Sequence, residues 1–201
     1  MADLSLDRPL PVAPSGYRSS GWWGLATVIA TEAALFIFLI FAYAYLGSQS
    51  ATPWPPGGAP ALRLALPNTF VLLLSSVAAW WGQKGIERGR QGQLVLGLAI
   101  ALVLGAIFAG VQAMEWADKP HGPSNSTYLS LYFTITGVHL AHVAVGLVLL
   151  LALLIWAISG CFTRRRHEHV GVGLLYWHFV DAVWLVVFTT FYLTPRMGIF
   201  R

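Results

Sequence analysis

Five long apolar runs alternate with short polar links along the chain. The runs cover residues 22–46, 68–85, 94–116, 127–159 and 170–193. Because an α-helix rises about 1.5 Å per residue, each run is long enough to cross the roughly 30 Å hydrocarbon core of a bilayer. The pattern predicts an all-α integral membrane bundle of five transmembrane helices.

The segments outside the runs are short. The link 47–66 is rich in proline and glycine and is expected to be an ordered turn region, with Pro67 opening the second helix. The first run is too long for the apolar core of a signal peptide, so we expect a retained helix. The predicted organisation is a flexible N-terminal tail over residues 1–21, a five-helix domain over 22–194 and a C-terminal tail over 195–201.

The composition supports a location in the bilayer. Hydrophobic residues make up 57% of the 201 residues, charged residues make up 10%, and the mean hydropathy is +0.66. A soluble domain usually has about 25% charged residues. The net charge of +4 does not indicate nucleic-acid binding, because the basic residues lie in short clusters between the runs. The single cysteine, Cys161, excludes an internal disulfide and a site made of several thiolates.

The distribution of basic residues predicts the orientation. With five spans, eight Lys and Arg residues fall on the side of the N-terminus and four on the side of the C-terminus. Since the side richer in Lys and Arg usually faces the cytoplasm, the N-terminus is expected inside and the C-terminus outside. Arg164, Arg165 and Arg166 form one of these clusters, as an inside anchor or as a contact for anionic lipid headgroups.

Glu32 is the one carboxylic acid within the first run, about ten residues and thus about 15 Å from its start. An ionised group at that depth costs several kcal/mol unless it is paired or faces protein. Two interpretations are open: the carboxyl binds a partner or conducts a proton, or it stays protonated and hydrogen-bonds to a neighbouring helix. In both, Glu32 is expected to face a neighbouring helix or a lipid-lined cleft.

The fourth run has a histidine pair, His139 and His142, whose spacing of three places both on one face of a helix. Such a pair can bind a metal, but a metal site usually needs a third or fourth ligand and supporting groups. The additional donors in the sequence are His178 and Asp181. We therefore favour interhelical hydrogen bonding over metal or haem ligation.

The last run repeats this spacing, with His178 and Asp181 three residues apart. Trp177, Asp181, Trp184 and Phe188 follow the helical period and predict one packed face. No nucleophile, oxyanion donor or cofactor motif accompanies the acid, so a packing role is favoured over acid–base catalysis.

Gln112 and Glu115 close the third run, next to Trp116 and Lys119. Their depth corresponds to the outer membrane interface, where exposure of a polar group costs little. A surface role is therefore expected for both side chains.

Five sequence elements resemble those of subunit III of the haem-copper oxidases, in the same order. They are Thr31-Glu32 followed by Phe36, Asn68-Thr69 after Pro67, Gln112-Ala113-Met114-Glu115-Trp116, Thr136-Gly137-x-His139-x-x-His142-Val143, and Tyr176-Trp177-His178-Phe179-Val180-Asp181. The resemblance covers roughly residues 22–194 and corresponds to the five-helix bacterial version of the family. Gly171 departs from it, since many members have a glutamate there.

The resemblance implies a subunit without haem or copper, both of which reside in partner subunits. It implies a bundle that packs against the catalytic subunit I, together with subunit II and a small subunit IV, in the bacterial plasma membrane. It further implies bound phospholipid and support of proton uptake by a complex that reduces oxygen to water. Within this chain we expect a buried polar network made of Glu32, His139, His142, His178 and Asp181.

Other functions stay open at this point. The residues found in these elements favour a cytochrome c oxidase over a quinol oxidase. An accessory protein of a nitric oxide reductase shares the fold and is a further alternative. From different classes, a small proton channel or transporter also places acids and histidines at the midplane, but inverted repeats and broken helices are absent from the sequence. A haem-binding membrane anchor is the last alternative.

Overall fold

The structure is a computed structural model that describes residues 20–51, 53–56, 58, 60–119, 122–164 and 167–198. Most of the predicted N-terminal tail, together with Arg165, Arg166 and residues 199–201, lies outside the described residues.

Every regular element in the described parts of the chain is helical. The long helices are α1 (Ser20–Ser48), α2 (Leu62–Glu87), α3 (Gln91–Ala117), α4 (Thr127–Ile158) and α5 (Glu168–Phe188). A 3₁₀ turn, η1 (Pro123–Asn125), precedes α4, and a π-helical segment, η2 (Thr189–Leu193), extends α5. Five segments are long and apolar enough to cross a membrane, which confirms the predicted fold class.

The start of the second helix differs from the prediction. Helix α2 begins at Leu62, and Pro67 lies inside it instead of opening it. The first four N–H groups of any helix have no intrahelical partner, so a proline at the sixth position removes only one of the early hydrogen bonds. This small loss lets the helix start about one turn before the proline.

Capping hydrogen bonds mark the ends of the helices in the connections between them. Between α2 and α3, Gly89 adopts a φ of +76°, and the amides of Gly89 and Arg90 donate to the carbonyls of Ile86 and Gly85. A left-handed glycine of this kind closes a helix without steric cost. At the start of α4, the Ser126 side chain accepts a hydrogen bond of 3.2 Å from the amide of Leu129. We call the end of the bundle that contains the turn 88–90 the basic end.

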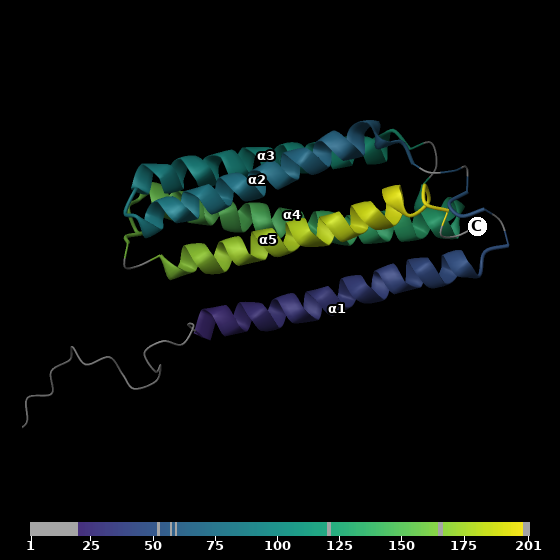
Figure 1. The fold of residues 1–201 in the computed structure, drawn as a ribbon, viewed down its shortest axis with the longest axis horizontal. Coiled ribbons are helices and arrows are strands. Elements are labelled where there is room, and N and C mark those ends of the chain that lie inside the picture. The colour runs from purple at the N-terminus through teal and green to yellow at the C-terminus, as the bar shows by residue number, and fades with distance from the viewer. Residues whose placement is uncertain are drawn as a thin grey trace, which may run out of the picture.

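Helices α2 to α5 pack side by side, and α1 lies along one side of this group (Figure 1). Helix α2 packs most extensively against α3, while the contacts of α1 are mainly with α4 and α5. Helix α5 touches α1, α2 and α4, so it holds a central position in the bundle.

The buried side chains follow this arrangement. Trp177, Asp181, Trp184 and Phe188 are all buried, which confirms the predicted face of the last helix. The buried residues of α1, by contrast, are Phe36, Tyr43 and Gly47, all in its second half. Helix α1 is therefore anchored away from the basic end and packs loosely near it.

Candidate functional site

Hydrogen bonds between α2 and α5 form the most extensive polar contact inside the bundle. The indole N–H of Trp184 donates to Thr69 Oγ1 at 3.0 Å, and that of Trp177 donates to Ser75 Oγ at 3.1 Å. All four side chains are buried. Because an unpaired N–H in an apolar interior costs free energy, these hydroxyls fix how α5 is rotated against α2.

Ser76, the residue after Ser75, contacts the two polar residues of α5. Its hydroxyl donates to Asp181 Oδ2 and lies 2.8 Å from His178 Nδ1. A hydroxyl has a single proton, so when it donates to the carboxylate it must accept from the Nδ1–H of His178. The reverse order, from a protonated Asp181 through Ser76 to Nδ1, satisfies the same geometry. The three side chains therefore form a hydrogen-bonded chain, and its geometry allows either order of donors and acceptors.

Trp177 is also the point at which three other helices meet α5. A Cβ atom at Gly105 of α3 or Gly146 of α4 would lie 2.6 or 2.7 Å from the Trp177 ring. Real side chains do not approach so closely, so glycine is required at both positions. The indole thus occupies a slot between α3 and α4 while its N–H reaches Ser75 on α2.

Glu32 faces a neighbouring helix, as predicted. Its Oε2 lies 3.0 Å from His142 Nε2, which links α1 to α4. The other ring nitrogen of His142 lies 2.7 Å from the Val138 carbonyl, which can only accept, so Nδ1 is the protonated nitrogen. The contact is then either an ion pair or a hydrogen bond from a neutral carboxyl to a neutral ring. Glu32 is 32% exposed, so the pair lies at the edge of the bundle.

The predicted interhelical hydrogen bond of His139 is not found among the described residues. His139 is buried, and its ring centroid lies 5.0 Å from that of Trp184 and 6.0 Å from that of Phe108. Its Nε2 has no hydrogen-bond partner among the described residues. The spacing of three separates two side chains by about 60° around a helix, so His142 turns to α1 while His139 points into the aromatic interior.

The predicted surface role of Gln112 and Glu115 is wrong. Gln112 is 1% exposed, and Glu115 accepts hydrogen bonds from Tyr132 at 3.1 Å and from Tyr192. Depth alone suggested the interface, but Gln112 is buried and the Glu115 carboxylate contacts tyrosines of α4 and η2. These contacts of Glu115 tie the end of α3 to α4 and η2.

Lys119 lies just beyond α3, with its Nζ 4.2 Å from the Tyr132 ring centroid. Burial lowers the pKa of Lys119, and the nearby Glu115 partly opposes this effect. The ammonium group thus sits above an aromatic face that offsets part of its lost hydration.

We call the contact of Thr69, Ser75 and Ser76 of α2 with α5 the seam. The sequence predicts none of these residues as site residues, and Asn68 and Thr69 appear there only in the resemblance. Asn68 Nδ2 donates to the Phe108 carbonyl at 3.1 Å and so links α2 to α3. The signal that could have indicated them is a set of small polar residues recurring along one side of an apolar run, which is typical of helix interfaces in membranes.

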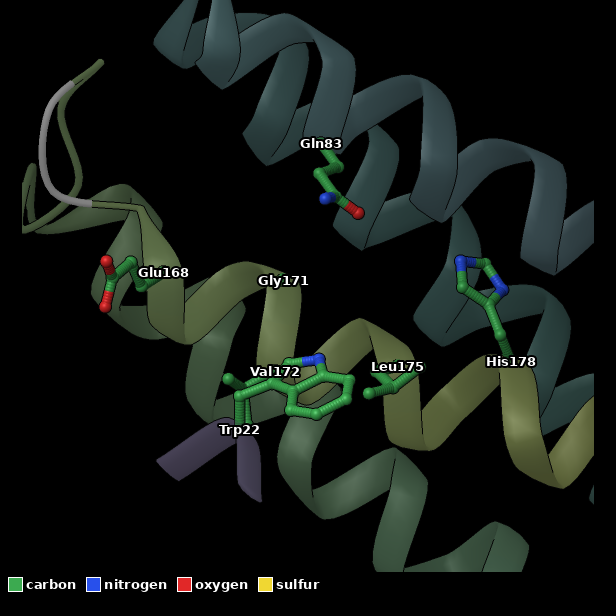
Figure 2. Close-up of a pocket in the computed structure, with 7 residues that line it drawn as sticks. All are labelled: Trp22, Gln83, Glu168, Gly171, Val172, Leu175 and His178. Atoms are coloured by element: carbon green, nitrogen blue, oxygen red, sulfur yellow. The ribbon is translucent and has the colours of Figure 1, made fainter. Parts of the chain in front are cut away.

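A cavity of about 380 Å³ opens between α1, α2 and α5 at the basic end (Figure 2). Glu168 and His178 line its two ends on α5, Gln83 reaches toward it from α2, and Trp22 covers it from α1. Gly171 lies in the middle of this wall, where a Cβ atom would meet only Gln83 Nε2 at 3.7 Å. The position at which many family members have a glutamate is therefore open space.

Arg164 is exposed in the link between α4 and α5, while Arg165 and Arg166 fall outside the described residues. Within the described parts of the chain, no three His, Cys, Asp or Glu side chains come close enough together to hold a metal ion.

A family model for cytochrome c oxidase subunit III matches residues 17–195. The chain belongs to the cytochrome c oxidase subunit III family. The carp (Cyprinus carpio) subunit is 34% identical over 178 residues, which cover 85% of this chain and 68% of the carp protein. The chicken (Gallus gallus) subunit is 34% identical over 191 residues, covering 90% and 71%. The Anopheles gambiae subunit is 33% identical over 179 residues, covering 85% and 68%.

Membership confirms the resemblance noted in the sequence. It makes the chain a non-redox member of an oxidoreductase complex that contains other oxidase subunits. Together with the five apolar helices, it also makes the chain a multi-pass membrane protein.

Proposed function

We propose that the chain is subunit III of an aerobic respiratory haem-copper terminal oxidase of the cytochrome c type, in the plasma membrane of a bacterium. It packs against the catalytic subunit I, beside subunit II and a small subunit IV, and stabilises the complex while oxygen is reduced to water. The observation that carries this proposal is the family match over residues 17–195, nearly the whole chain.

The internal contacts support a scaffolding role. Four of the five side chains of the predicted polar network make hydrogen bonds across helices. Glu32 of α1 pairs with His142 of α4, and His178 and Asp181 of α5 both contact Ser76 of α2. Such contacts hold helices together in a bilayer, where apolar surfaces provide little net attraction between them. A subunit whose helices are held together in this way presents a rigid outer surface to its partner subunits.

An apolar cavity supports phospholipid binding. It measures about 300 Å³ and is lined on the α4 side by Leu149, Leu153 and Trp156 and on the α5 side by Val172. Glu168 and His169 also line it, and Arg164 is exposed in the preceding link. An acyl chain fits the apolar walls, and Arg164 attracts the phosphate of its headgroup.

The orientation belongs to the same proposal. Lys84, Arg88, Arg90 and Arg164 lie in or beside the links at the basic end. By the preference of basic residues for the inside, this end faces the cytoplasm and the C-terminus lies outside.

Purification of the tagged chain from its native membrane in a mild detergent tests the proposal. Mass spectrometry of the purified sample should identify subunits I and II, and the sample should show haem absorbance and oxidise reduced cytochrome c. A chain that purifies alone would contradict the proposal. Activity with a quinol but not with cytochrome c would reassign it to a quinol oxidase, and proton flux through the reconstituted chain alone would favour a transporter.

A further inference from the structure

The cavity at the basic end leads toward the hydrogen-bonded chain of His178, Ser76 and Asp181. Its far end is lined by His178, ten residues along α5 from Glu168 at the mouth, which corresponds to a depth of about 15 Å. His178 Nδ1 lies 2.8 Å from Ser76 Oγ, and Ser76 donates to Asp181. Open space and hydrogen-bonded groups therefore follow one another from the end of the bundle to a buried carboxyl.

The walls of the cavity suit water. Glu168, Gln83 and His178 supply polar groups along its length, between the apolar side chains of Val172 and Leu175. A water molecule in a protein usually makes two to four hydrogen bonds, and its share of liquid volume is about 30 Å³, so about 380 Å³ holds several. A purely apolar occupant would leave these polar groups without partners.

We propose that this cavity is a water-filled inlet through which Asp181 exchanges protons with the aqueous phase at the basic end. A hydronium ion in the cavity protonates His178 at Nε2, since Nδ1 is bound to Ser76, and becomes water. The Nδ1 proton then passes to Ser76 Oγ, whose own proton passes to Asp181 Oδ2. The carboxyl becomes neutral and the imidazole is left with a single proton on Nε2.

This proton transfer stops at Asp181. The next polar contact of α5 is the indole of Trp184, which is donor-only and already donates to Thr69. Asp181 itself is 4% exposed, and its Oδ1 has no partner among the described residues. The titratable side chains that line the cavity are Glu168 at the mouth and His178 at the far end. The inlet is therefore a one-sided proton store and not a channel across the membrane.

This inference stands apart from the proposed function, except that the side of the membrane on which the inlet opens rests on the proposed orientation. Cysteine labelling tests the water content in the purified complex. Cys161, which is exposed, is first changed to serine to provide a background. In that background, Leu175→Cys, or Gln83→Cys if the first variant does not assemble, is treated with a charged, water-soluble methanethiosulfonate reagent.

Leu185→Cys, on the same helix at a position that is 40% exposed on the outer face of the bundle, is the control. Labelling in the inlet is expected to be at least about tenfold faster than in the control. The thiolate is the form that reacts, and apolar surroundings that raise the thiol pKa of the control by one unit remove about nine-tenths of its thiolate. Gly171→Leu should block the inlet and abolish the difference, while Gly110→Leu, a glycine with nothing within 4 Å, should preserve it. Equal rates at Leu175 and Leu185 would show a lipid-filled cavity and overturn the inference.

Time-resolved infrared spectroscopy tests the connection to Asp181. After a drop in pH, a protonated carboxyl band that is missing in Asp181→Asn should appear rapidly in the unmodified protein. The rapid phase should be lost in Gly171→Leu and in Ser76→Ala but retained in Gly110→Leu. An unchanged rate in both test variants would overturn the inference. Haem content of the same samples reports assembly, so loss of partners with intact labelling would contradict the proposed function alone.

Discussion

Helices α1 and α5 cross the bundle side by side, yet they are held in different ways. Half of the most apolar 18-residue window of α5 is buried, against 6% of that of α1. Helix α5 inserts two indoles and an aspartate against the hydroxyl groups of α2, whereas α1 is joined to α4 through the partly exposed pair of Glu32 and His142. Both helices are long and apolar enough to cross a membrane, and α1 is the more apolar of the two. Their difference shows that buried polar partners, and not apolar length, decide which helix is locked in the bundle.

The substitution expected to damage this arrangement most is Trp177→Ala. It removes a fully buried indole and leaves Ser75 without its donor, so it should lower the free energy of unfolding by about 3–5 kcal/mol. Unfolding in dodecyl sulfate, followed by circular dichroism, measures the change. Trp80→Ala, at a position that is 53% exposed, is the matched control and should cost far less. Equal losses would show that Trp177 is no more important than an exposed tryptophan.

Gly146→Ala tests the slot that receives this indole. The added methyl would lie 2.7 Å from the Trp177 ring, and relief of the clash should cost about 1–3 kcal/mol. Gly110→Ala introduces the same methyl where nothing lies within 4 Å, and it should be neutral or slightly stabilising. The same dodecyl sulfate titration compares them, and a neutral Gly146→Ala would contradict the assigned fit.

Ser76→Ala separates the hydrogen bonds of the seam from its packing. It leaves both His178 and Asp181 without this partner and should cost about 1–2 kcal/mol. Ser159→Ala removes a hydroxyl that bonds only to its own helix at Ile155, so little change is expected. If the two serine variants unfold alike, the contact of Ser76 does not contribute to the docking of α5.

Glu32→Gln should have a smaller effect. The amide can still donate to His142, and the pair is partly exposed, so the expected loss is below about 1 kcal/mol. A loss in free energy of unfolding comparable to that of Trp177→Ala would show that α1 is held as strongly as α5, which would contradict the difference between the two helices.

The smallest effect concerns Lys119. Since burial lowers its pKa in the folded protein below the ordinary value of 10.5, the unfolded state binds more protons between the two pKa values. The free energy of unfolding therefore rises with pH across that interval. Below it Lys119 is charged in both states, and its burial lowers the free energy of unfolding by an amount that does not change with pH. Lys119→Gln should flatten the rise in a pH series of unfolding curves. A rise that is unchanged in the variant would assign it to another group.

The sequence was sufficient for the number of helices, the face of α5 and the direction in which Glu32 points. These three features follow from the periodicity of the sequence and the depth of a residue in the membrane. Both can be derived from one apolar run without knowledge of its neighbours. The contact of Ser76 with Asp181 and the burial of Gln112 depend on how two helices are rotated against each other, and no single run determines that rotation. The predicted helix start at Pro67 is wrong because a proline near a helix start removes few hydrogen bonds. A start at Pro67 and a start one turn earlier are therefore both physically acceptable.

The most direct test of the contrast between α1 and α5 needs no substitution. Hydrogen–deuterium exchange of the backbone amides, followed by mass spectrometry on the intact complex in detergent, reports local opening along each helix. Amides of residues 20–31, the part of α1 without buried side chains, are expected to exchange faster than those of residues 36–47 and those of α5. Equal protection along the whole of α1 and α5 would contradict the account.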